Sequence, residues 1–491
     1  MMKAIDCFVF YEETKEIKKT IQNLLAEELV NNIYLLTKSS VSSGIKGCIN
    51  LPITSLLSTE TVKKIAVHAK APYSLIFLKN TMLELGQFAL ERFYQIANDT
   101  QAGLVYADYY QITNGTRSKL PVIDYQLGSV RDDFNFGSVL FYNTECLRKA
   151  VSEFSDNYQY AGFYDLRLKV SQCTELIHID EYLYSDVELD IRKSGEKQFD
   201  YVDPKNREIQ LEMEKACTDH LKKIGAYLKP VFKKISFNEE KFPVEASIII
   251  PVKNRVTTIE DAIRSALSQK TTFEFNVIIV DNYSTDGTSQ IIAKYAKKDE
   301  RIIHVIPERE DLLIGGCWNL AIHHPLCGKF AVQLDSDDIY QDENTLQTIV
   351  EAFYEQNCGM VVGSYTTTDF NMNILPPGLI DHKEWTPENG RNNALRVNGF
   401  GAPRAFYTPL LRKIKVPNSN YGEDYALGLV FSRDYQIGRI YRSLYLCRRW
   451  KDNSDAELDP ATLNLYNHYK DKIRTIEIKA RQQKNKLELN K

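Results

Sequence analysis

Residues 246–252 read ASIIIPV, residues 276–281 read NVIIVD, and residues 330–338 read FAVQLDSDD. The first two stretches contain continuous apolar, largely β-branched runs, which are typical of strands buried on both faces of a parallel sheet. Residues 330–334 (FAVQL) indicate another strand. Residues 259–267 and 288–296 place apolar residues at helical spacing between these strands. The alternation predicts an α/β domain whose mostly parallel sheet is covered by helices on both faces.

Acidic residues follow two of these strands directly. Asp281 ends the second strand, and Asp335, Asp337 and Asp338 come straight after the third. In open sheets of this class, ligands bind at the carboxyl ends of the strands. We therefore expect these carboxylates to line one cleft.

The acidic turn at residues 335–338 has the chemistry of a cation site. Carboxylates at positions i and i+2 suit Mg²⁺ or Mn²⁺, which keep coordination positions open for phosphate oxygens. A cation held there would stabilise the charge that develops on a leaving diphosphate. The competing interpretation is an acidic turn that caps the following helix.

Three other polar stretches are weaker signals when each is taken alone. Asp281 lies in VDNYSTDGT, whose residues are also ordinary loop residues. Glu423 and Asp424 enter a helical pattern, where a carboxylate could deprotonate a hydroxyl group or only stabilise the helix N-terminus. The basic stretch at residues 448–451, which includes Arg449, could compensate a departing diphosphate or form a solvated loop.

In their order and spacing, these motifs resemble those of the family 2 glycosyltransferases, which have the GT-A fold. The resemblance covers residues 246–455 and rests on SIIIPVKN, VDNYSTDGT, GGCWNLAI, LDSDD, GED and CRRWKDNSD. It implies an inverting transferase that moves a hexosyl or N-acetylhexosaminyl group from a UDP-, GDP- or dTDP-linked donor. The implied acceptor is a glycan or a lipid-linked glycan of bacterial surface polysaccharide synthesis, and the implied cofactor is Mn²⁺ or Mg²⁺.

The resemblance also implies roles for individual residues. Asp424, beside Glu423, would be the catalytic base, and Asp335 and Asp337 would hold the metal ion. The chain has Cys317-Trp318 where many family members have Ala-Arg, so the arginine that could contact phosphate from this loop is missing. The set expected to bind the nucleotide sugar is Pro251, Asn254, Arg255, Asp281, Asn319, Asp335, Ser336 and Arg449.

The first 190 residues repeat the pattern of the second half. FG at 136–137 and LRK at 147–149 recur in the same order as FG at 400–401 and LRK at 411–413. NIYLL at 32–36 resembles NVIIV at 276–280, and LIFL at 75–78 lies 25 residues before Gly103 as AVQL at 331–334 lies 25 residues before Gly359. Three matches in the same order indicate a duplicated domain.

The first copy keeps the apolar strands and loses the carboxylates. In this alignment Asp281 falls on Thr37, and the turn at 335–337 falls on Lys79, Asn80 and Thr81. The Glu-Asp pair falls on Gly162-Phe163. A lysine at a cation site repels the cation, so we expect the first copy either to bind acceptor glycan or only to stabilise the protein.

The expected fold class is therefore α/β, with two Rossmann-like GT-A domains in tandem joined by a helical linker. The expected segments are a degenerate, non-catalytic GT-A-like domain at 1–190, a linker helix and connector at 191–243, a catalytic domain at 244–457 and a helical tail at 458–491. A heptad stripe in the tail predicts packing on the protein, pairing as a homo-oligomer, or contact with a membrane surface. The stripe consists of Tyr466, Tyr469, Ile473, Ile476 and Ala480.

Composition excludes several classes of protein. A net charge of −4 gives no reason to expect a nucleic-acid partner. The sequence contains no run of eighteen apolar residues, so it predicts no transmembrane helix. Nine scattered cysteines without a CxxC pair argue against a zinc site and fit a reducing cytoplasm. We expect a cytoplasmic protein, for which peripheral contact with the inner face of the cell membrane is an alternative.

The alternatives to a transferase are a nucleotidyltransferase and a non-catalytic glycan-binding protein. The nucleotidyltransferase usually has a Gly-rich phosphate loop, and neither GxGxxG nor GxxxxGK[ST] occurs here.

Overall fold

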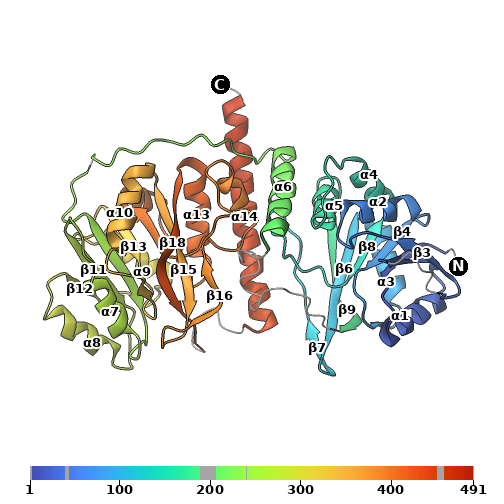
Figure 1. Ribbon diagram of the computed structural model, residues 1–491, viewed down its shortest axis with the longest axis horizontal. Helices are drawn as coiled ribbons and strands as arrows, with labels where there is room; N and C mark the ends of the chain where they lie inside the picture. The colour runs from blue at the N-terminus through green and yellow to red at the C-terminus, as the bar shows by residue number, and fades with distance from the viewer. Residues whose placement is uncertain (1–2, 39–43, 188–205, 239, 451–457, 490–491) are drawn as a thin grey trace. The chain divides into compact units, whose positions relative to one another are not determined.

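The computed structural model describes residues 3–38, 44–187, 206–238, 240–450 and 458–489 (Figure 1). The chain divides into two compact units. The first comprises Met1–Arg192, Glu208–Tyr227 and Leu458–Ile478, and the second comprises Lys193–Arg207, Leu228–Glu457 and Lys479–Lys491. Each unit is therefore assembled from stretches that are far apart in the sequence.

The first unit is an α/β sheet domain. Its strands are β1 (Ile5–Phe10), β2 (Val30–Thr37), β3 (Cys48–Pro52), β4 (Tyr73–Phe77), β5 (Leu83–Leu85), β6 (Leu104–Thr113), β7 (Thr116–Leu120), β8 (Val139–Asn143) and β9 (Leu176–Val187). Its helices are α1 (Lys15–Ala26), α2 (Thr59–His68), α3 (Ala89–Thr100), α4 (Thr144–Ser152), α5 (Gly162–Ser171) and α6 (Arg207–Lys223), the last of which starts one residue before the boundary of the unit.

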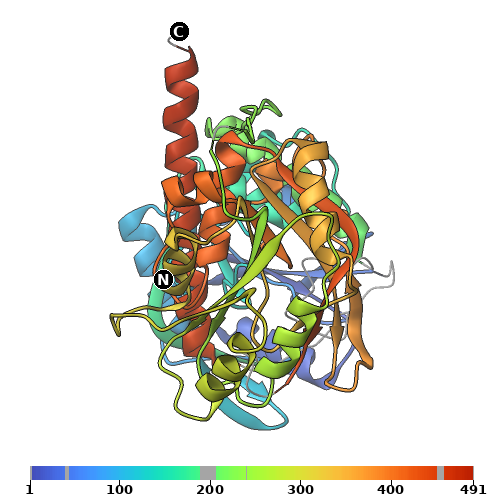
Figure 2. The ribbon, with the colours of Figure 1, turned by 90° about the vertical axis from the view of Figure 1, so that its left-hand side faces the viewer.

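The second unit has the same kind of architecture (Figure 2). Its strands are β10 (Ala246–Val252), β11 (Phe275–Asp281), β12 (Ile302–Val305), β13 (Phe330–Gln333), β14 (Ile339–Tyr340), β15 (Met360–Thr368), β16 (Ile374–Ile380), β17 (Arg404–Tyr407) and β18 (Ile437–Arg448). Its helices are α7 (Ile259–Leu267), α8 (Thr288–Ala296), α9 (Ile314–His323), α10 (Thr345–Gln356), α11 (Gly390–Asn393), α12 (Thr408–Ile414) and α13 (Glu423–Asp434). Helix α14 (Pro460–Leu489) belongs in part to each unit.

The two sheets have the same strand order. The first runs β3-β2-β1-β4-β8-β6-β9-β5 with β7 paired to β6, and the second runs β12-β11-β10-β13-β17-β15-β18-β14 with β16 paired to β15. Each strand of one sheet thus has a counterpart at the same place in the other. Two tandem α/β domains of one topology agree with the fold class expected from the sequence.

Both sheets are mixed. In the second unit β10, β11, β12 and β13 are parallel neighbours, whereas β17, β16 and β14 pair antiparallel with the strands beside them. Strands β10, β11 and β13 and helices α7 and α8 lie where the sequence pattern predicts them, whereas β12 was not predicted. Because parallel strands end at one edge, the segments that follow β10, β11 and β13 meet there.

Equivalent hydrogen bonds establish which residues of the two units correspond. The N–H of Thr144 donates to the carbonyl of Pro72, and in the second unit the N–H of Thr408 donates to the carbonyl of Lys329. Tyr73 and Phe330 follow these two carbonyl groups and are the first residues of β4 and β13. The two strands therefore align with Tyr73 opposite Phe330 in sequence. The same alignment pairs the first residue of α4 with the first residue of α12.

This register corrects the alignment made from the sequence. Asp335 corresponds to Leu78 rather than to Lys79, and Asp337 corresponds to Asn80 rather than to Thr81. The expected pairing was wrong by one residue, because the uniformly apolar runs of the two strands match equally well at either register. The absence of aspartate from this turn of the first unit is unchanged by the correction.

Apolar side chains fill a separate core in each unit. Val9 and Leu75 are completely buried in the first, and Ile248 and Val332 are completely buried in the second. All nine cysteines are free thiols. In the described part of the chain, no helix combines the length and the apolar composition that crossing a membrane would require.

Helix α14 does not pack by the heptad stripe expected from the sequence. Ile476 of that stripe is 60% exposed, whereas Asp471, Arg474 and Arg481 are completely buried. The buried face of this helix is therefore largely charged, and its side chains pair with partners inside each unit.

Candidate active site

The acidic turn after β13 begins with a carboxylate held by side chains of the sheet. Both carboxylate oxygens of Asp335 accept hydrogen bonds from Nε2 of Gln333, at 3.0 and 2.8 Å. The backbone N–H of Asp335 donates to Oη of Tyr445 in β18, at 2.8 Å. The start of the turn is thus anchored on two strands.

The next two acids are tied to Arg448 and Trp450 at the end of β18. The N–H of Arg448 donates to Oδ1 of Asp338 at 2.7 Å, and its Nε donates to the carbonyl of Asp337 at 2.5 Å. The indole N–H of Trp450 donates to Oδ2 of Asp337 at 3.2 Å. Arg255, from the loop after β10, lies 3.9 Å from the same carboxylate oxygen. These contacts bring the expected donor loop and the expected metal ligand together.

The carboxylates of the turn interact electrostatically. Burial raises the pKa of Asp335, against the opposing effects of Arg404 and Gln333. Burial raises the pKa of Asp338 further, and the negative charges of Asp337 and Asp335 add to this effect. A cation among these groups would relieve their mutual repulsion.

Asp281 lies at the carboxyl end of β11 and is almost completely buried. Its carboxylate accepts hydrogen bonds from the N–H of Ser284 at 3.1 Å and from the hydroxyl of Ser289, and Nε2 of His304 lies 3.3 Å from it. Burial opposes ionisation, but these hydrogen bonds prevail and lower the pKa of Asp281 to about 2. The group is thus a permanently charged acceptor.

The loop after β10 is folded against the loop after β11. Asn254 has a left-handed backbone with φ of 53°, and its Oδ1 accepts a hydrogen bond from the N–H of Thr285 at 2.8 Å. Its own N–H donates to Oγ of Ser284 at 2.9 Å. This pairing places the two donor-binding loops predicted from the sequence side by side.

The Glu-Asp pair starts α13 and contacts Arg404 of β17. Nη1 of Arg404 lies 3.0 Å from Oδ2 of Asp424. Burial works against the charged form of Arg404, but the charges of Asp424, Asp335 and Glu423 together raise its pKa. Burial raises the pKa of Glu423 to about 8, with the neighbouring Asp424 as the second cause. Arg404 therefore pairs with the base candidate and interacts electrostatically with the metal-ligand candidate.

The Gly-rich start of α9 holds the segment that leads into this pair. A Cβ on Gly315 would lie 1.7 Å from the carbonyl oxygen of Pro417, so only glycine allows this approach. The N–H of Gly315 donates to the carbonyl of Ser419 at 3.1 Å. Asn319 bonds to both backbone groups of Val416, at 2.7 and 2.9 Å.

The remaining predicted residues contact backbone groups or lie within the sheet. Asn319, expected to bind the donor, has its amide turned to Val416, so its contacts are with the chain that carries the base. Pro251 lies within β10, and the carbonyl of Ser336 accepts a hydrogen bond from Thr258. Arg449 donates its N–H to the carbonyl of Thr368 at 2.7 Å. Lys451 lies outside the described residues.

Sequence reasoning undervalued three residues of this site. From its sequence context, GAPRAFY, Arg404 is only a weak candidate for acceptor binding, and Gln333 and Tyr445 belong to none of the family's motifs. Gln333 follows the strand alternation as a polar residue in an apolar run, which was the available signal. Arg404 and Tyr445 lie on β17 and β18, and only the sheet pairing brings them to the acids.

The equivalent region of the first unit is filled by its own side chains. Lys79 and Thr81 both contact the buried carboxylate of Asp186 in β9, Thr81 at 3.2 Å. At the N-terminus of α5, where the second unit has its Glu-Asp pair, three successive N–H groups from residues 159–161 donate to the carboxylate of Glu212 in α6, at 3.0, 2.7 and 3.1 Å. In the first unit, Lys79 thus lies in the turn that corresponds to the acidic turn of the second unit. The carboxylate of Glu212 binds the helix N-terminus that corresponds to the start of α13.

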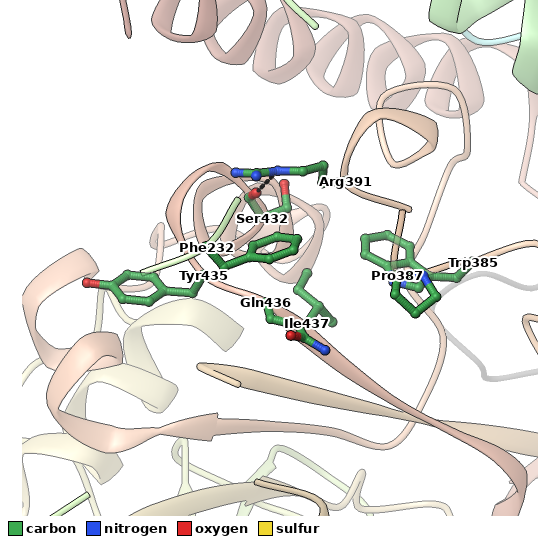
Figure 3. A pocket seen from close by; sticks show the side chains of 8 residues that line it. All are labelled: Phe232, Trp385, Pro387, Arg391, Ser432, Tyr435, Gln436 and Ile437. Atoms are coloured by element: carbon green, nitrogen blue, oxygen red, sulfur yellow. Dashed lines mark hydrogen bonds between the residues drawn. The ribbon is translucent and has the colours of Figure 1, made fainter. Parts of the chain in front are cut away.

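A small pocket on the second unit is separate from the acids (Figure 3). Arg391 on its wall donates Nε to the carbonyl of Ser432 at 2.9 Å and Nη1 to the carbonyls of Lys229 and Val231 at 2.7 and 2.9 Å. Its guanidinium serves backbone carbonyls and is not presented to a ligand. The lining residues are Phe232, Trp385, Pro387, Arg391, Ser432, Tyr435, Gln436 and Ile437.

The acids have the chemistry of a partial metal site. In the described ranges, no cluster of three or more His, Cys, Asp and Glu side chains is placed to hold a metal ion. Asp335 and Asp337 supply hard carboxylate oxygens, and Mg²⁺ is commonly bound by one or two carboxylates together with substrate phosphates. The residues present therefore fit a cation whose coordination a phosphate ligand completes.

This fold and this arrangement of acids define an α/β domain of the GT-A type. Residues 247–406 match the model of the family described as glycosyl transferase family 2. This match agrees with the family that the sequence motifs indicate.

Curated relatives match about a quarter of the chain. The chain is 35% identical over 120 residues to a putative teichuronic acid biosynthesis glycosyltransferase, TuaG, of Bacillus subtilis, a match covering 24% of this chain and 46% of the relative. It is 29% identical over 117 residues to the O-antigen chain rhamnosyltransferase WbaN of Salmonella anatum, covering 24% of this chain and 36% of the relative. The matches thus span less than half the length of these relatives.

Two solved structures have weaker likeness. Fragment 1–349 of S. aureus TarS in complex with UDP-GlcNAc is 22% identical, with a TM-score of 0.37, over 46% of this chain and 72% of that one. The mannosyltransferase PcManGT of Pyrobaculum calidifontis, in complex with GDP-Man and Mn²⁺, is 16% identical, with a TM-score of 0.34, over 55% of this chain and 81% of that one.

Proposed function

We propose that the second unit is an inverting glycosyltransferase that moves a sugar from a nucleoside diphosphate to an acceptor hydroxyl group. The observation that carries this proposal is the position of Arg404, which pairs with Asp424 and interacts with Asp335. One cationic side chain thereby links the end of β13 to the start of α13. The family match over residues 247–406 supports sugar transfer as the reaction class.

In this mechanism Asp424 accepts the proton of the acceptor hydroxyl as its oxygen attacks the anomeric carbon. The bond between that carbon and the diphosphate oxygen breaks, and the electron pair leaves with the nucleoside diphosphate. A single displacement inverts the anomeric centre. Arg404 holds the Asp424 carboxylate in place through the 3.0 Å contact, which orients the base.

Asp335 and Asp337 would hold Mn²⁺ or Mg²⁺. When bound, such an ion neutralises the charge on the leaving diphosphate. Arg255 faces Asp337 from the opposite loop and adds positive charge on the same side. Asp281 accepts a hydrogen bond from the nucleotide base, for which its permanently charged carboxylate is suited.

The acceptor class follows from the named relatives. TuaG is described as an enzyme of teichuronic acid biosynthesis and WbaN as a transferase of O-antigen chains. By analogy, we place this chain in the synthesis of a bacterial surface polysaccharide, with a glycan or lipid-linked glycan as acceptor. The donor sugar is a hexose or N-acetylhexosamine.

The first unit serves as a scaffold in this proposal. Asn80 and Leu78 stand where the second unit has its two metal ligands. Lys79 and Thr81 bind Asp186, and Glu212 fills the N-terminus of α5. At these positions, all of them in the described part of the chain, the first unit therefore has neither the carboxylates that would hold a metal ion nor a side chain free to act as the base in sugar transfer.

The test is a panel of UDP-, GDP- and dTDP-sugars incubated with the full chain and Mn²⁺, with release of nucleoside diphosphate as the measurement. We expect release from one or a few donors, and none after EDTA treatment. The stereochemistry of the product, read by NMR, should be inverted. Failure to turn over any donor with any offered acceptor or with water, together with no donor binding, would reject a transferase.

A further inference from the structure

Tyr283 has a backbone conformation that its side chain disfavours. It lies two residues after Asp281 and has φ of 59°, in the left-handed region that favours glycine. A bulky residue held in this region marks strain that the surrounding structure must sustain. Such strain accumulates at ligand sites, so the position calls for a functional reason.

The Tyr283 ring is tethered at its far end but left open on its surface. Its hydroxyl donates to the carbonyl of Pro307 at 2.5 Å, which links the loop after β11 to the segment after β12. The residue is nevertheless 36% exposed. The hydrogen bond holds the far end of the ring, while part of the residue remains exposed to solvent.

This ring stands beside the acceptor groups that suit a nucleotide base. Asp281 precedes it, and the neighbouring Asn282 has a buried Oδ1 without a hydrogen-bond donor in the described structure. The Asn282 amide orientation is set because its Nδ2 donates to the carbonyl of Leu312 at 2.8 Å. At the next strand end, Ile306 is 55% exposed and follows β12. Exposed apolar side chains and oxygen atoms that can accept hydrogen bonds from N–H groups thus lie at the same edge of the sheet.

We infer that Tyr283 is the stacking surface for the nucleobase of the donor. The ring contacts the base face, and Asp281 and Asn282 accept hydrogen bonds from its N–H edge. This inference rests on the proposed function, since it names the residue that supplies base affinity at the same site. Stacking tolerates every base, so Tyr283 contributes affinity while the acceptor groups select bases with N–H donors.

The competing role is a purely structural tether through the hydroxyl group. A tether needs the bond to Pro307 and gains nothing from a ring that faces solvent. The two roles separate cleanly in two variants. Tyr283→Phe keeps the ring and removes the tether, whereas Tyr283→Gly removes both and suits the left-handed backbone.

The experiment measures binding of UDP, GDP and dTDP, each with Mn²⁺, by calorimetry on the full chain. For the nucleotide that binds best, we expect Tyr283→Gly to raise Kd about 10-fold and Tyr283→Phe to change it less than threefold. Binding of inorganic pyrophosphate with Mn²⁺ should be unchanged in both, because it carries no base. Melting curves should show both variants folded, and Tyr283→Asn, which also tolerates this backbone, serves if the glycine variant unfolds.

Three results would overturn the inference. Unchanged nucleotide affinity in Tyr283→Gly would remove the ring from the site, and equal losses in the two main variants would assign the effect to the tether. A matching loss of pyrophosphate binding would indicate general damage to the loop. If the unaltered chain binds none of the nucleotides, the proposed function fails together with this inference, whereas the first three results leave the proposed function intact.

Discussion

At the scale of single residues, the site is organised by charge pairs between strands. Arg404 connects Asp424 to the surroundings of Asp335, and Arg448 holds the turn that contains Asp337 and Asp338. In a buried setting such pairs are sensitive to the loss of one partner. Substitutions here therefore report on chemistry and on positioning.

The metal-ligand assignment predicts unequal effects at equivalent positions of the two units. Asp337→Ala should reduce donor turnover below detection while leaving the fold intact, because the charge of the leaving diphosphate is no longer neutralised. Asn80→Ala, the matched change in the first unit, should leave turnover near normal. Turnover with Mn²⁺ and melting temperature are measured for both. Full activity of Asp337→Ala, or of EDTA-treated protein, would contradict the assignment.

The base assignment predicts a selective loss of turnover. Asp424→Asn preserves shape and removes the proton acceptor, so kcat should fall on the order of 10²–10⁴-fold with little change in donor Kd. Glu300→Gln, an exposed carboxylate of the same unit outside the site, is the control and should match the unaltered enzyme. A normal kcat in Asp424→Asn would exclude it from proton transfer.

The raised pKa of Glu423 predicts that the stability of the protein depends on pH. Its folded pKa of about 8 exceeds its ordinary value of 4.5, so the folded state binds the proton more tightly than the unfolded state. The stabilising contribution is complete below pH 4.5 and is lost as the pH rises through 8. In EDTA, the melting temperature of the unaltered chain should fall between pH 5 and 8.5, and Glu423→Gln should reduce this fall. Parallel curves for the two proteins would show that Glu423 does not titrate in this range.

At the scale of elements, helix α9 positions the loop that carries the base. Its N-terminal turn contacts the backbone of Pro417 and Ser419, and Asn319 binds both backbone groups of Val416. The Gly-rich motif thus acts through packing against the segment before α13. Its effect on catalysis is indirect, through the position of Asp424.

This packing predicts the effect of one methyl group. Gly315→Ala would place a Cβ 1.7 Å from the Pro417 carbonyl oxygen, so the loop must move away. We expect kcat to fall at least tenfold with donor Kd changed less than threefold, because the donor-binding acids lie on other loops. His323→Ala, at an exposed position of the same helix, should be neutral. A Gly315→Ala enzyme with normal kcat would show that the loop tolerates the shift.

At the scale of the whole molecule, the first unit is completed by the last helix of the chain. Asp471 of α14 is completely buried and accepts a hydrogen bond from Ser129 at 2.9 Å, and it pairs with Arg131 and Arg474 at 3.3 and 2.7 Å. The backbone of α14 approaches Gly128 so closely that a Cβ there would lie 2.2 Å from the carbonyl oxygen of Asp471. A fragment that ends near residue 200 would therefore lack part of its own domain.

The buried charge of α14 predicts a loss of stability centred on the first unit. Asp471→Asn should lower the free energy of unfolding by about 3 kcal/mol, because Arg131 and Arg474 lose their buried counter-charge. Lys472→Ala, at an exposed position of the same helix, should change it by less than 0.5 kcal/mol. Chemical denaturation gives both values. Equal stability of the two variants would show that the pairing contributes nothing.

Much of the fold was predictable because apolar patterns report burial directly. The runs at 246–252 and 276–281 form β10 and β11, and the helical spacing at 259–267 forms α7. The heptad stripe of the tail failed as a guide to packing, since α14 buries arginine and aspartate that satisfy one another. Charge pairing of that kind leaves no apolar periodicity to detect.

The sequence by itself indicated the family resemblance of residues 246–455, the acidic ends of β11 and β13, and the order of the motifs. These features depend on local composition and short spacing, which survive without knowledge of contacts. Only the tertiary structure paired Arg404 with Asp424 and turned Asn319 towards the backbone of Val416. It also set the register by which Asp337 corresponds to Asn80. Such relations depend on which strands pair and how far they are staggered, and a linear pattern of apolar residues is compatible with more than one stagger.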